Sequence, residues 1–181
     1  MMLFFTLFLT VVLAAQVYGA WLNEAQNKES FRFECPQNQA ISRVVSEHGN
    51  RYEDRKFQFV CSRAPVRSLT SCEWSDFTYT RNKPLHYQCH KSGVITGVYS
   101  TYDVKYQDRK FSFQCCSPSD GVVLHACETT SWTNEFDRRQ DFKVPVGNVM
   151  RGWTSIYNSY KHDRRYAITY CKVGKIVAID D

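Results

Sequence analysis

The sequence lacks every common catalytic motif. It contains no Gly-x-Ser-x-Gly, no His-Glu-x-x-His and no glycine-rich phosphate loop, the patterns that position a nucleophile, a zinc ion or a nucleotide. No two carboxylates are spaced as a recognisable acid–base pair, and cysteines that are all oxidised would supply no thiol nucleophile. We therefore expect no enzymatic activity and no cofactor.

Metal-binding patterns and glycosylation signals are also missing. There is no Cys-x-x-Cys pair, and the five histidines do not have the spacing of zinc ligands. They stand at positions 48, 86, 90, 125 and 162. Asn-x-Ser/Thr sequons are absent. We predict neither a metal site nor an N-linked glycan.

Long apolar runs are scarce, and the only one lies at the start of the chain. Residues 1–19 carry no charged side chain, and the apolar run ends at Ala15, short of the roughly 20 residues that span a bilayer. Val17 and Gly19 fit the −3 and −1 positions of signal-peptidase cleavage. We expect residues 1–19 to be a signal peptide, with a retained N-terminal anchor as the alternative. The mature chain would begin at Ala20, be secreted and have no stable membrane insertion.

The composition is that of one folded domain. The chain has 181 residues, of which 43% are hydrophobic and 15% aromatic, which excludes a disordered chain, a coiled coil, a collagen and a multi-span membrane protein. This length suits a single domain, which we place at residues 20–181. The 23 basic and 18 acidic side chains leave a net charge of +5. That mild excess allows binding to acidic polysaccharide, a membrane surface or nucleic acid without choosing among them.

One motif occurs three times in the chain. Its copies are 54 and then 55 residues apart, and they read Asp54-Arg55-Lys56-Phe57, Asp108-Arg109-Lys110-Phe111 and Asp163-Arg164-Arg165-Tyr166. Upstream positions keep the same intervals, as in Ser46, Ser100 and Ser155. Each unit also begins near a tryptophan, which divides the chain into units 21–73, 74–131 and 132–181. Such periodicity indicates one supersecondary unit that was copied.

Each unit is predicted to be β-structure. After the Asp-Arg pair, apolar residues alternate with others, as at Phe57, Phe59 and Cys61, which is the pattern of a half-buried strand. Polar stretches such as 47–50 are expected to be hairpin loops, and no window shows a helical stripe. Three such units predict an all-β, disulfide-bridged fold with a closed pseudo-threefold architecture, either a β-prism of three sheets or, as the alternative, a β-trefoil. Closure would remove exposed sheet edges.

The repeat also restricts the pairing of the eight cysteines. Two pairs at corresponding positions of the first two units each span 26 residues, and two other pairs each span 44. Neighbouring strand residues point to opposite faces, so Cys115 and Cys116 should form different bridges. In the third unit Val144 and Tyr170 take the place of the shorter bridge. The predicted disulfides are Cys35–Cys61, Cys89–Cys115, Cys72–Cys116 and Cys127–Cys171.

The repeated pattern is also that of a known family. It reads Asp-Arg-x-aromatic-x-aromatic-x-Cys, accompanied by a leading Trp, by the segment Phe33-Glu34-Cys35-Pro36 and by the adjacent cysteines 115 and 116. This pattern, which extends from Trp21 to Cys171, resembles the dermatopontin family. The chain lacks the Tyr-rich acidic N-terminal stretch of vertebrate dermatopontin and is more similar to the invertebrate hemagglutinin/amebocyte aggregation factors.

The resemblance implies a non-enzymatic extracellular protein. Relatives bind glycosaminoglycans and matrix components, promote adhesion, agglutinate cells or occur in biomineral matrix, and some are described as cytotoxic. We therefore expect a secreted adhesion or agglutination protein that binds glycosaminoglycan, other cell-surface glycans or extracellular matrix proteins, not nucleic acid, as a monomer or homo-oligomer. The alternatives are a membrane-active cytotoxic defence or venom protein and a structural component of a biomineral or collagen matrix.

The Asp-Arg pairs have two interpretations. Their guanidinium groups could bind sulfate or carboxylate bidentately, or each could pair with its neighbouring Asp or a main-chain carbonyl and hold the start of a strand. Because a repeat copies what its fold requires, we favour the structural interpretation. It applies to Asp54, Arg55, Asp108, Arg109, Asp163 and Arg164.

Basic and aromatic residues near the turns form the candidate ligand-binding set. Three similar clusters could bind one polyanion at several linked points, each of them weak and screened by salt, and exposed tyrosine rings could stack on sugars. The alternative is that the charges are ordinary solvated loop residues. The predicted set is Arg51, Lys56, Lys105, Lys110, Lys161 and Arg165 with Tyr52, Tyr106 and Tyr160; Tyr102 and Tyr157 lie in the same polar segments.

Overall fold

The computed structural model describes residues 28–78, 82–119 and 121–175. The expected signal peptide and Trp21 lie outside the described residues. Within the described part every regular element is a β-strand, so the predicted all-β class is confirmed.

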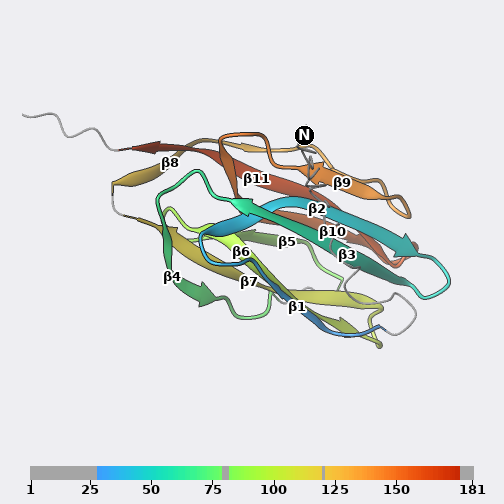
Figure 1. Cartoon of the computed structure of the whole chain (residues 1–181). Coiled ribbons are helices and arrows are strands. Elements are labelled where there is room, and N and C mark those ends of the chain that lie inside the picture. Colours follow the sequence, from blue (N-terminus) through green and yellow to red (C-terminus); the bar gives the residue numbers. More distant parts are fainter. Residues whose placement is uncertain (1–27, 79–81, 120, 176–181) are drawn as a thin grey trace, which may run out of the picture.

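Three long antiparallel hairpins form the frame of the molecule (Figure 1). Each begins a few residues after a short strand and ends with the alternating aromatic run that follows the Asp-Arg pair, because aromatic and β-branched side chains at every second position pack one face of a strand. The hairpins are β2 (Gln39–Gly49) with β3 (Asp54–Arg63), β6 (Val94–Asp103) with β7 (Asp108–Pro118), and β10 (Asn148–Asn158) with β11 (Asp163–Lys175).

One expected loop is placed differently. The stretch 47–50 was predicted to be a hairpin loop, but β2 continues to Gly49 and the turn occupies residues 50–53. Glu47 and His48 are paired with Lys56 and Arg55 of β3. The polar side chains are tolerated on a strand because they have charged partners: Glu47 pairs with Lys56, and His48 lies 3.3 Å from Asp163 of β11.

Three short strands connect the hairpins to one another. Each precedes one hairpin in the chain but pairs with a different hairpin: β1 (Phe31–Glu34) with β6, β5 (Leu85–Gln88) with β10, and β9 (Gln140–Lys143) with β2. Two further strands, β4 (Leu69–Trp74) and β8 (Val122–Thr129), pair with β7 and β11. The sheet orders are β3-β2-β9, β1-β6-β7-β4 and β5-β10-β11-β8.

A single aromatic cluster fills the space between the three sheets. The residues that follow Asp-Arg-x in the three units, Phe57, Phe111 and Tyr166, are at most 1% exposed, and their ring centroids lie 5.8–6.4 Å from one another. Trp153 contacts all three rings at 5.4–6.4 Å. Edge-to-face and stacked pairs at these separations stabilise a core beyond the effect of burial alone.

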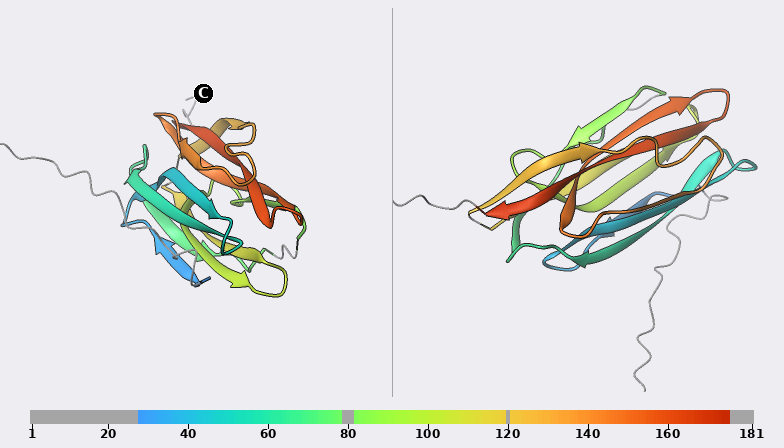
Figure 2. Two further views of the ribbon diagram at one scale, coloured as in Figure 1. Left: turned by 90° about the vertical axis from the view of Figure 1, so that its right-hand side faces the viewer. Right: turned by 90° about the horizontal axis from the view of Figure 1, so that it is seen from above.

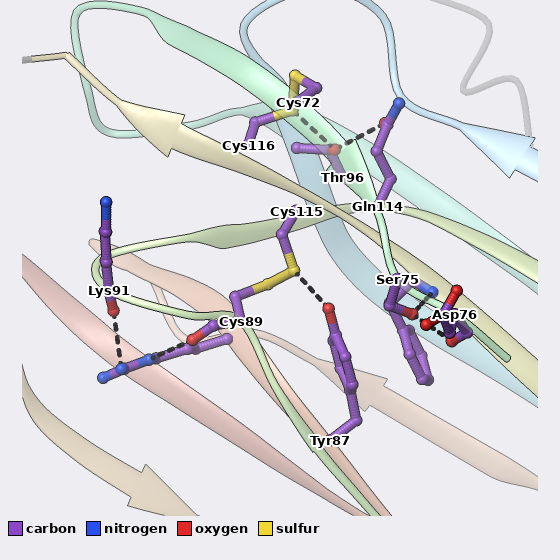
Figure 3. Close-up of a disulfide and its surroundings, with 12 residues drawn as sticks. Cys72, Ser75, Asp76, Tyr87, Cys89, Lys91, Thr96, Gln114, Cys115 and Cys116 are labelled. Atoms are coloured by element: carbon purple, nitrogen blue, oxygen red, sulfur yellow. Dashed lines mark hydrogen bonds between the residues drawn. A yellow bond between two sulfur atoms is a disulfide. The ribbon is translucent and has the colours of Figure 1, made fainter. Parts of the chain in front are cut away.

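Four disulfides connect the sheets and loops. The bonded pairs are Cys35–Cys61, Cys89–Cys115, Cys72–Cys116 and Cys127–Cys171, the four pairs that the repeat spacing predicts. Figure 3 shows that the adjacent Cys115 and Cys116 of β7 point to different partners, as opposite faces of a strand require. In the third unit, where Val144 and Tyr170 stand in place of the shorter disulfide, Val144 is buried and Tyr170 packs against the same core.

Candidate functional site

The three hairpin turns lie together at one end of the molecule. Figure 1 shows them at the right, and the left view of Figure 2 looks onto that end. The hydroxyl of Tyr102 donates to the carbonyl oxygen of Glu53 at 2.9 Å, and that of Tyr157 lies 3.1 Å and 3.2 Å from the carbonyl oxygens of Tyr106 and Gln107. We call residues 50–53, 104–107 and 159–162 the turn face.

Below the turn face the Asp-Arg motifs form three buried ion pairs. Each arginine binds both carboxylate oxygens of an aspartate from another hairpin: Arg55 binds Asp163, Arg109 binds Asp54 and Arg164 binds Asp108, all at 2.6–2.9 Å. All six residues are 3–5% exposed. The pairs therefore run in a cycle through the three hairpins.

An arginine was expected to pair with its neighbouring aspartate or with a main-chain carbonyl. Each arginine does bind a main-chain carbonyl, as in Arg55 to the carbonyl oxygen of Arg138 at 3.1 Å. The neighbouring carboxylate instead accepts the backbone N–H of the next residue, as in Arg55 N to Asp54 Oδ1 at 2.7 Å and Arg109 N to Asp108 Oδ1 at 2.8 Å. The aspartate thus binds the backbone of the residue that follows it and the arginine of another hairpin. Its partner could not be read from the chain, because the two residues are more than 50 positions apart.

The protein itself supplies most of the hydrogen-bond partners of the three guanidinium groups. Arg55 has five N–H donors, and they make two bonds to Asp163, two to the carbonyl of Arg138 and one to Ser46 Oγ. The other two arginines repeat the pattern with the carbonyls of Glu29 and Lys83 and with the hydroxyls of Ser100 and Ser155. A sulfate or carboxylate from outside would find no free donor on Arg55.

Burial and ion pairing act in opposite directions on Asp163. Desolvation raises its pKa, but hydrogen bonds and charge from His48 and Arg55 outweigh that effect and hold the pKa of the carboxyl well below its usual value of 3.8. His48 Nδ1 lies 3.3 Å from Asp163 Oδ1, and its Nε2 lies 3.7 Å from Glu53 Oε2. The side chain of His48 is 1% exposed.

A narrow cavity leads from the turn face down to the ion pairs. Two sets of repeat-equivalent residues line the part of the cavity nearest the turn face. The first set is His48, Tyr102 and Tyr157, and the second is Glu53, Gln107 and His162. Its volume of about 20 Å³ has room for about one water molecule. Burial and the nearby carboxylates raise the pKa of Tyr157 to about 12. The cavity is too small for a sugar.

Tyr102 and Tyr157 serve the fold rather than forming exposed stacking rings. Their hydroxyls bond to neighbouring turns, and both are half-buried. His48, Tyr102 and Tyr157 stand at the same position of the three repeat units. The motif analysis did not select His48, although its place in the repeat could have identified it.

Most of the predicted cations have acidic partners in the structure. Lys56 pairs with Glu47 at 3.4 Å and Lys110 with Asp103 at 3.8 Å. Arg165 pairs with Glu135 at 2.7 Å. These three lie on the strands β3, β7 and β11, away from the turn tips. The interpretation as ordinary solvated charges is strongest for them.

The turn face itself carries the other predicted residues. Arg51 and Lys105 are exposed and lie over the rings of Tyr52 and Tyr106 at 5.6 Å and 5.5 Å. Neither forms an ion pair with a residue that the structure describes. Tyr160 is 87% exposed. The turn face thus combines available cations with exposed aromatic surface.

Lys161 and Val104 complete the turn face. Lys161 is exposed and pairs with Asp137 at 2.9 Å, which leaves its charge partly compensated. Val104 is 72% exposed and stands beside Lys105.

A larger groove near two of the disulfides provides less suitable binding surface (Figure 3). It has a volume of about 460 Å³ and is lined in part by Trp74 and Tyr87. However, Arg32 lies 4.4 Å over the Trp74 ring. Tyr87 stacks on Phe113 at 4.6 Å, and its hydroxyl contacts Cys115 Sγ at 3.1 Å. One face of each ring is therefore already covered by the protein.

The fold and the turn face define a class: a disulfide-bridged, all-β protein that presents a basic and aromatic surface and no arrangement of catalytic groups that we recognise in its described part. Residues 25–176 match the model of the family described as Dermatopontin. The chain belongs to the dermatopontin family.

Three curated relatives show the range of this family. The chain is 28% identical to the hemagglutinin/amebocyte aggregation factor of Limulus polyphemus, over 85% of this chain and 88% of the relative. It is 31% identical to dermatopontin of Biomphalaria glabrata, over 80% and 95% of the two chains. It is 30% identical to Millepora cytotoxin-1 of Millepora dichotoma, over 81% of this chain and 64% of that protein. No solved structure matches.

Among the residues that the structure describes, no helix is long and apolar enough to cross a membrane.

Proposed function

We propose that this protein is a secreted, non-enzymatic adhesion and agglutination protein whose turn face binds glycosaminoglycan or other acidic cell-surface glycans. The observation that carries the proposal is the meeting of three turns at one end, where Arg51 and Lys105 are exposed beside tyrosine rings. A relative named hemagglutinin/amebocyte aggregation factor supports the same class of activity. Extracellular matrix proteins that carry such glycans are the corresponding protein partners.

The mechanism depends on several weak contacts made at once. We infer that the three sheets are related by an approximate threefold axis, in a β-prism-like arrangement of one domain, because corresponding strands pair in corresponding registers. The turns would then present cations at spaced positions toward successive acidic groups of one polymer. Linked contacts of this kind raise avidity by orders of magnitude although each is weak.

The buried ion pairs would contribute indirectly. They join the first residues of β3, β7 and β11 to one another, so the turns that precede those residues are held in a fixed relation. A site that is rigid before binding loses less conformational entropy when the ligand arrives. The cations on the turns bind, and the ion pairs below position them.

A charge-matched pair of variants tests the proposal. Arg51→Ser/Lys105→Ser removes two cations from the turn face, while Arg63→Ser/Arg67→Ser removes two exposed cations from the other end of the hairpins. On a heparin column the first variant should elute at clearly lower salt than the second, which should remain close to the natural protein. Equal elution of the two variants would show that only net charge matters and would contradict a specific site.

A second candidate function is membrane perturbation. Val104 and Tyr160 are 72% and 87% exposed on the same face as the cations, a combination that suits the interface of an anionic membrane, and one relative is named a cytotoxin. Erythrocytes separate the two functions: clumping without haemoglobin release supports adhesion, and rapid release supports membrane damage.

A further inference from the structure

The groove beside the Cys89–Cys115 disulfide separates strand β4 from the loop that follows β5. We call it the side groove: the β4 side contributes Glu73, Ser75 and Asp76, and the β5 side contributes Tyr87, His90 and Lys91. Figure 3 shows Ser75 and Asp76 on one side of the disulfide and Lys91 on the other. Its volume of about 460 Å³ lies within the range of small-molecule sites.

The repeat shows which of these side chains the fold itself requires. The three loops correspond, because the N–H groups of residues 39, 93 and 148 each donate to the carbonyl three positions earlier. Where this loop has Tyr87 and His90, the other two units have phenylalanine and proline. These residues are Phe33 and Pro36 in the first unit and Phe142 and Pro145 in the third. The phenol hydroxyl and the imidazole are therefore additions to a fold that is built without them.

The carboxylate of Glu73 also differs from its counterpart. Glu73 faces Cys115 across β4 and β7, as Glu128 faces Tyr170 across β8 and β11. The Tyr170 hydroxyl donates to Glu128 Oε2 at 2.9 Å, whereas Cys115 is held in a disulfide and offers no donor. Glu73 and Asp76 are exposed, and neither carboxylate has a hydrogen-bond or ion-pair partner among the residues that the structure describes. Both carboxylates are available to a ligand.

The side groove thus combines hydrogen-bond acceptors with donors. The two carboxylates accept, the Lys91 ammonium donates, and the His90 ring carries both kinds of nitrogen when it is neutral. The Tyr87 hydroxyl donates to Cys115 Sγ at 3.1 Å, and its oxygen still accepts. A neutral molecule rich in hydroxyl groups matches this set, since each hydroxyl both donates and accepts. A polyanion does not, because the two carboxylates would repel it.

We propose that the side groove is a second ligand site, which binds a neutral sugar residue of a cell-surface or matrix glycan. Glu73 and Asp76 would accept hydrogen bonds from neighbouring sugar hydroxyls, and His90 and Tyr87 would bind hydroxyls from the opposite wall. Because the protein already covers one face of the Tyr87 ring, hydrogen bonds rather than a sandwich of rings would hold the sugar.

The side groove lies far from the turn face. Cys115 stands eight residues after Gln107, which on an extended strand corresponds to about 25 Å, and in Figure 1 β4 lies at the left while the turns lie at the right. One chain would therefore hold a neutral sugar on one surface and an acidic glycan on another. This bridging rests on the proposed function of the turn face, whereas sugar binding by the groove does not.

Titration with soluble neutral sugars tests the site. The probes are galactose, mannose, glucose and N-acetylglucosamine, followed by calorimetry and by NMR saturation transfer on the intact oxidised protein. A salt concentration of about 0.5 M screens the ionic contacts of the turn face. At least one probe is expected to bind. If none of the four binds, the proposal is overturned.

Two variants at equivalent positions locate the bound sugar. Glu73→Ala removes a carboxylate from the side groove and should weaken binding roughly tenfold or more, because a hydrogen bond to a charged group is lost. Glu128→Ala removes the corresponding carboxylate of the third unit and should bind the sugar as the natural protein does. Equal affinity in the two variants would place the sugar elsewhere and refute the proposal.

A variant that restores the repeat removes the two additions at once. Tyr87→Phe/His90→Pro introduces the residues that the other units have at these positions, so it should form the four disulfides and unfold at nearly the natural temperature. It should lose sugar binding and keep its elution from a heparin column, whereas Arg51→Ser/Lys105→Ser should do the opposite. Sugar binding that survives in the folded double variant contradicts the proposal. If the double variant is not secreted, the comparison of Glu73→Ala with Glu128→Ala decides.

A basic peptide is the other ligand that two free carboxylates suit. Tetralysine is the probe for it, at low salt and with the same two glutamate variants. Tetralysine binding that Glu73→Ala weakens, without binding of any sugar, would assign the side groove to a cationic partner and refute the proposal.

Discussion

Six charged side chains are buried where the three hairpins meet, and each depends on a partner from another hairpin. The distances of 2.6–2.9 Å and the two parallel bonds of every pair are those of strong charge-assisted hydrogen bonds. Burying a pair gains little compared with an apolar pair, but removing one member leaves an uncompensated charge in the interior. We therefore expect the motif to stabilise the fold rather than to bind a ligand.

Replacing one arginine should reveal this dependence. Arg109→Ala leaves Asp54 buried without its partner and should lower the free energy of unfolding by about 3–5 kcal/mol, as measured by urea denaturation. Lys110→Ala, one position further along β7, removes a half-exposed lysine whose ion pair contributes about 0–1 kcal/mol. Similar losses for the two variants would show that the buried pairs are not the source of the stability.

Acid should destabilise the protein through Asp163. Its pKa in the folded state is held below the unfolded value, so the folded state binds this proton less readily than the unfolded state. The contribution is fully present above about pH 4 and is lost as the pH falls toward the folded pKa. Unfolding free energies measured between pH 2 and pH 6 should show this decline, and Asp163→Asn, though less stable throughout, should show a smaller decline. An unchanged slope in the variant would exclude Asp163 as the cause.

At the scale of the elements, the short strands β1, β5 and β9 link the hairpins, because each precedes one hairpin in the chain and pairs with another. β1, β5 and β9 have the same burial pattern, in which the first and third residues face the interior, and each places an aromatic residue, Phe33, Tyr87 or Phe142, against the core. The hairpin that receives each strand has a register shift at one point, at Ile41/Arg43, Ile95/Gly97 and Met150/Gly152. At Gly97 and Gly152 a Cβ atom would come within 2.9 Å of a carbonyl oxygen of β1 or β5, so glycine allows this close approach.

The third repeat unit shows what can take the place of a disulfide. Cys35–Cys61 closes a loop whose entropy contribution is about 3.5 kcal/mol in the chain-entropy model, while Val144 and Tyr170 stand at the equivalent positions of the third unit. Cys35→Ala/Cys61→Ala should therefore lower the midpoint of thermal unfolding strongly. Cys35→Val/Cys61→Tyr should recover part of that loss by apolar packing. If the second variant were no more stable than the first, a Val–Tyr pair would take the place of the disulfide only in the third unit.

The sequence predicted the strand that follows each Asp-Arg pair, but not the bounds of the hairpins or the strands that join them. The alternation at Phe57, Phe59 and Cys61 is a local property, so it identified a strand directly. The extension of β2 through Glu47 and His48 was not predicted, because polar residues on a strand are explained only by the charged groups that the fold places beside them.

For the whole molecule, surface and interior charges should respond differently to salt. The turn face would bind a polyanion through exposed cations, which are screened over a distance that falls from roughly 10 Å at 0.1 M to 3 Å at 1 M salt. The ion pairs are buried and are screened far less. We expect heparin binding to be lost over this salt range while the free energy of unfolding changes little, as followed by column elution and urea denaturation. Binding that persisted at 1 M salt would point to stacking or apolar contacts instead.

Agglutination requires a protein to contact two surfaces, and one turn face serves only one of them. Either a second copy of the chain supplies another turn face, or the same chain has a second binding surface. Size-exclusion chromatography with light scattering at the concentrations that clump erythrocytes distinguishes them.

The amino-acid sequence by itself determined the all-β class, the repeat interval and the disulfide pairs, because alternation, periodicity and spacing are properties of the chain that survive without coordinates. Only the tertiary structure decided which aspartate each arginine binds, which hairpin each short strand joins and which cations remain available at the turn face. These depend on contacts between residues 50 to 110 positions apart, where the three copies of the motif offer several partners of the same type and only packing selects among them.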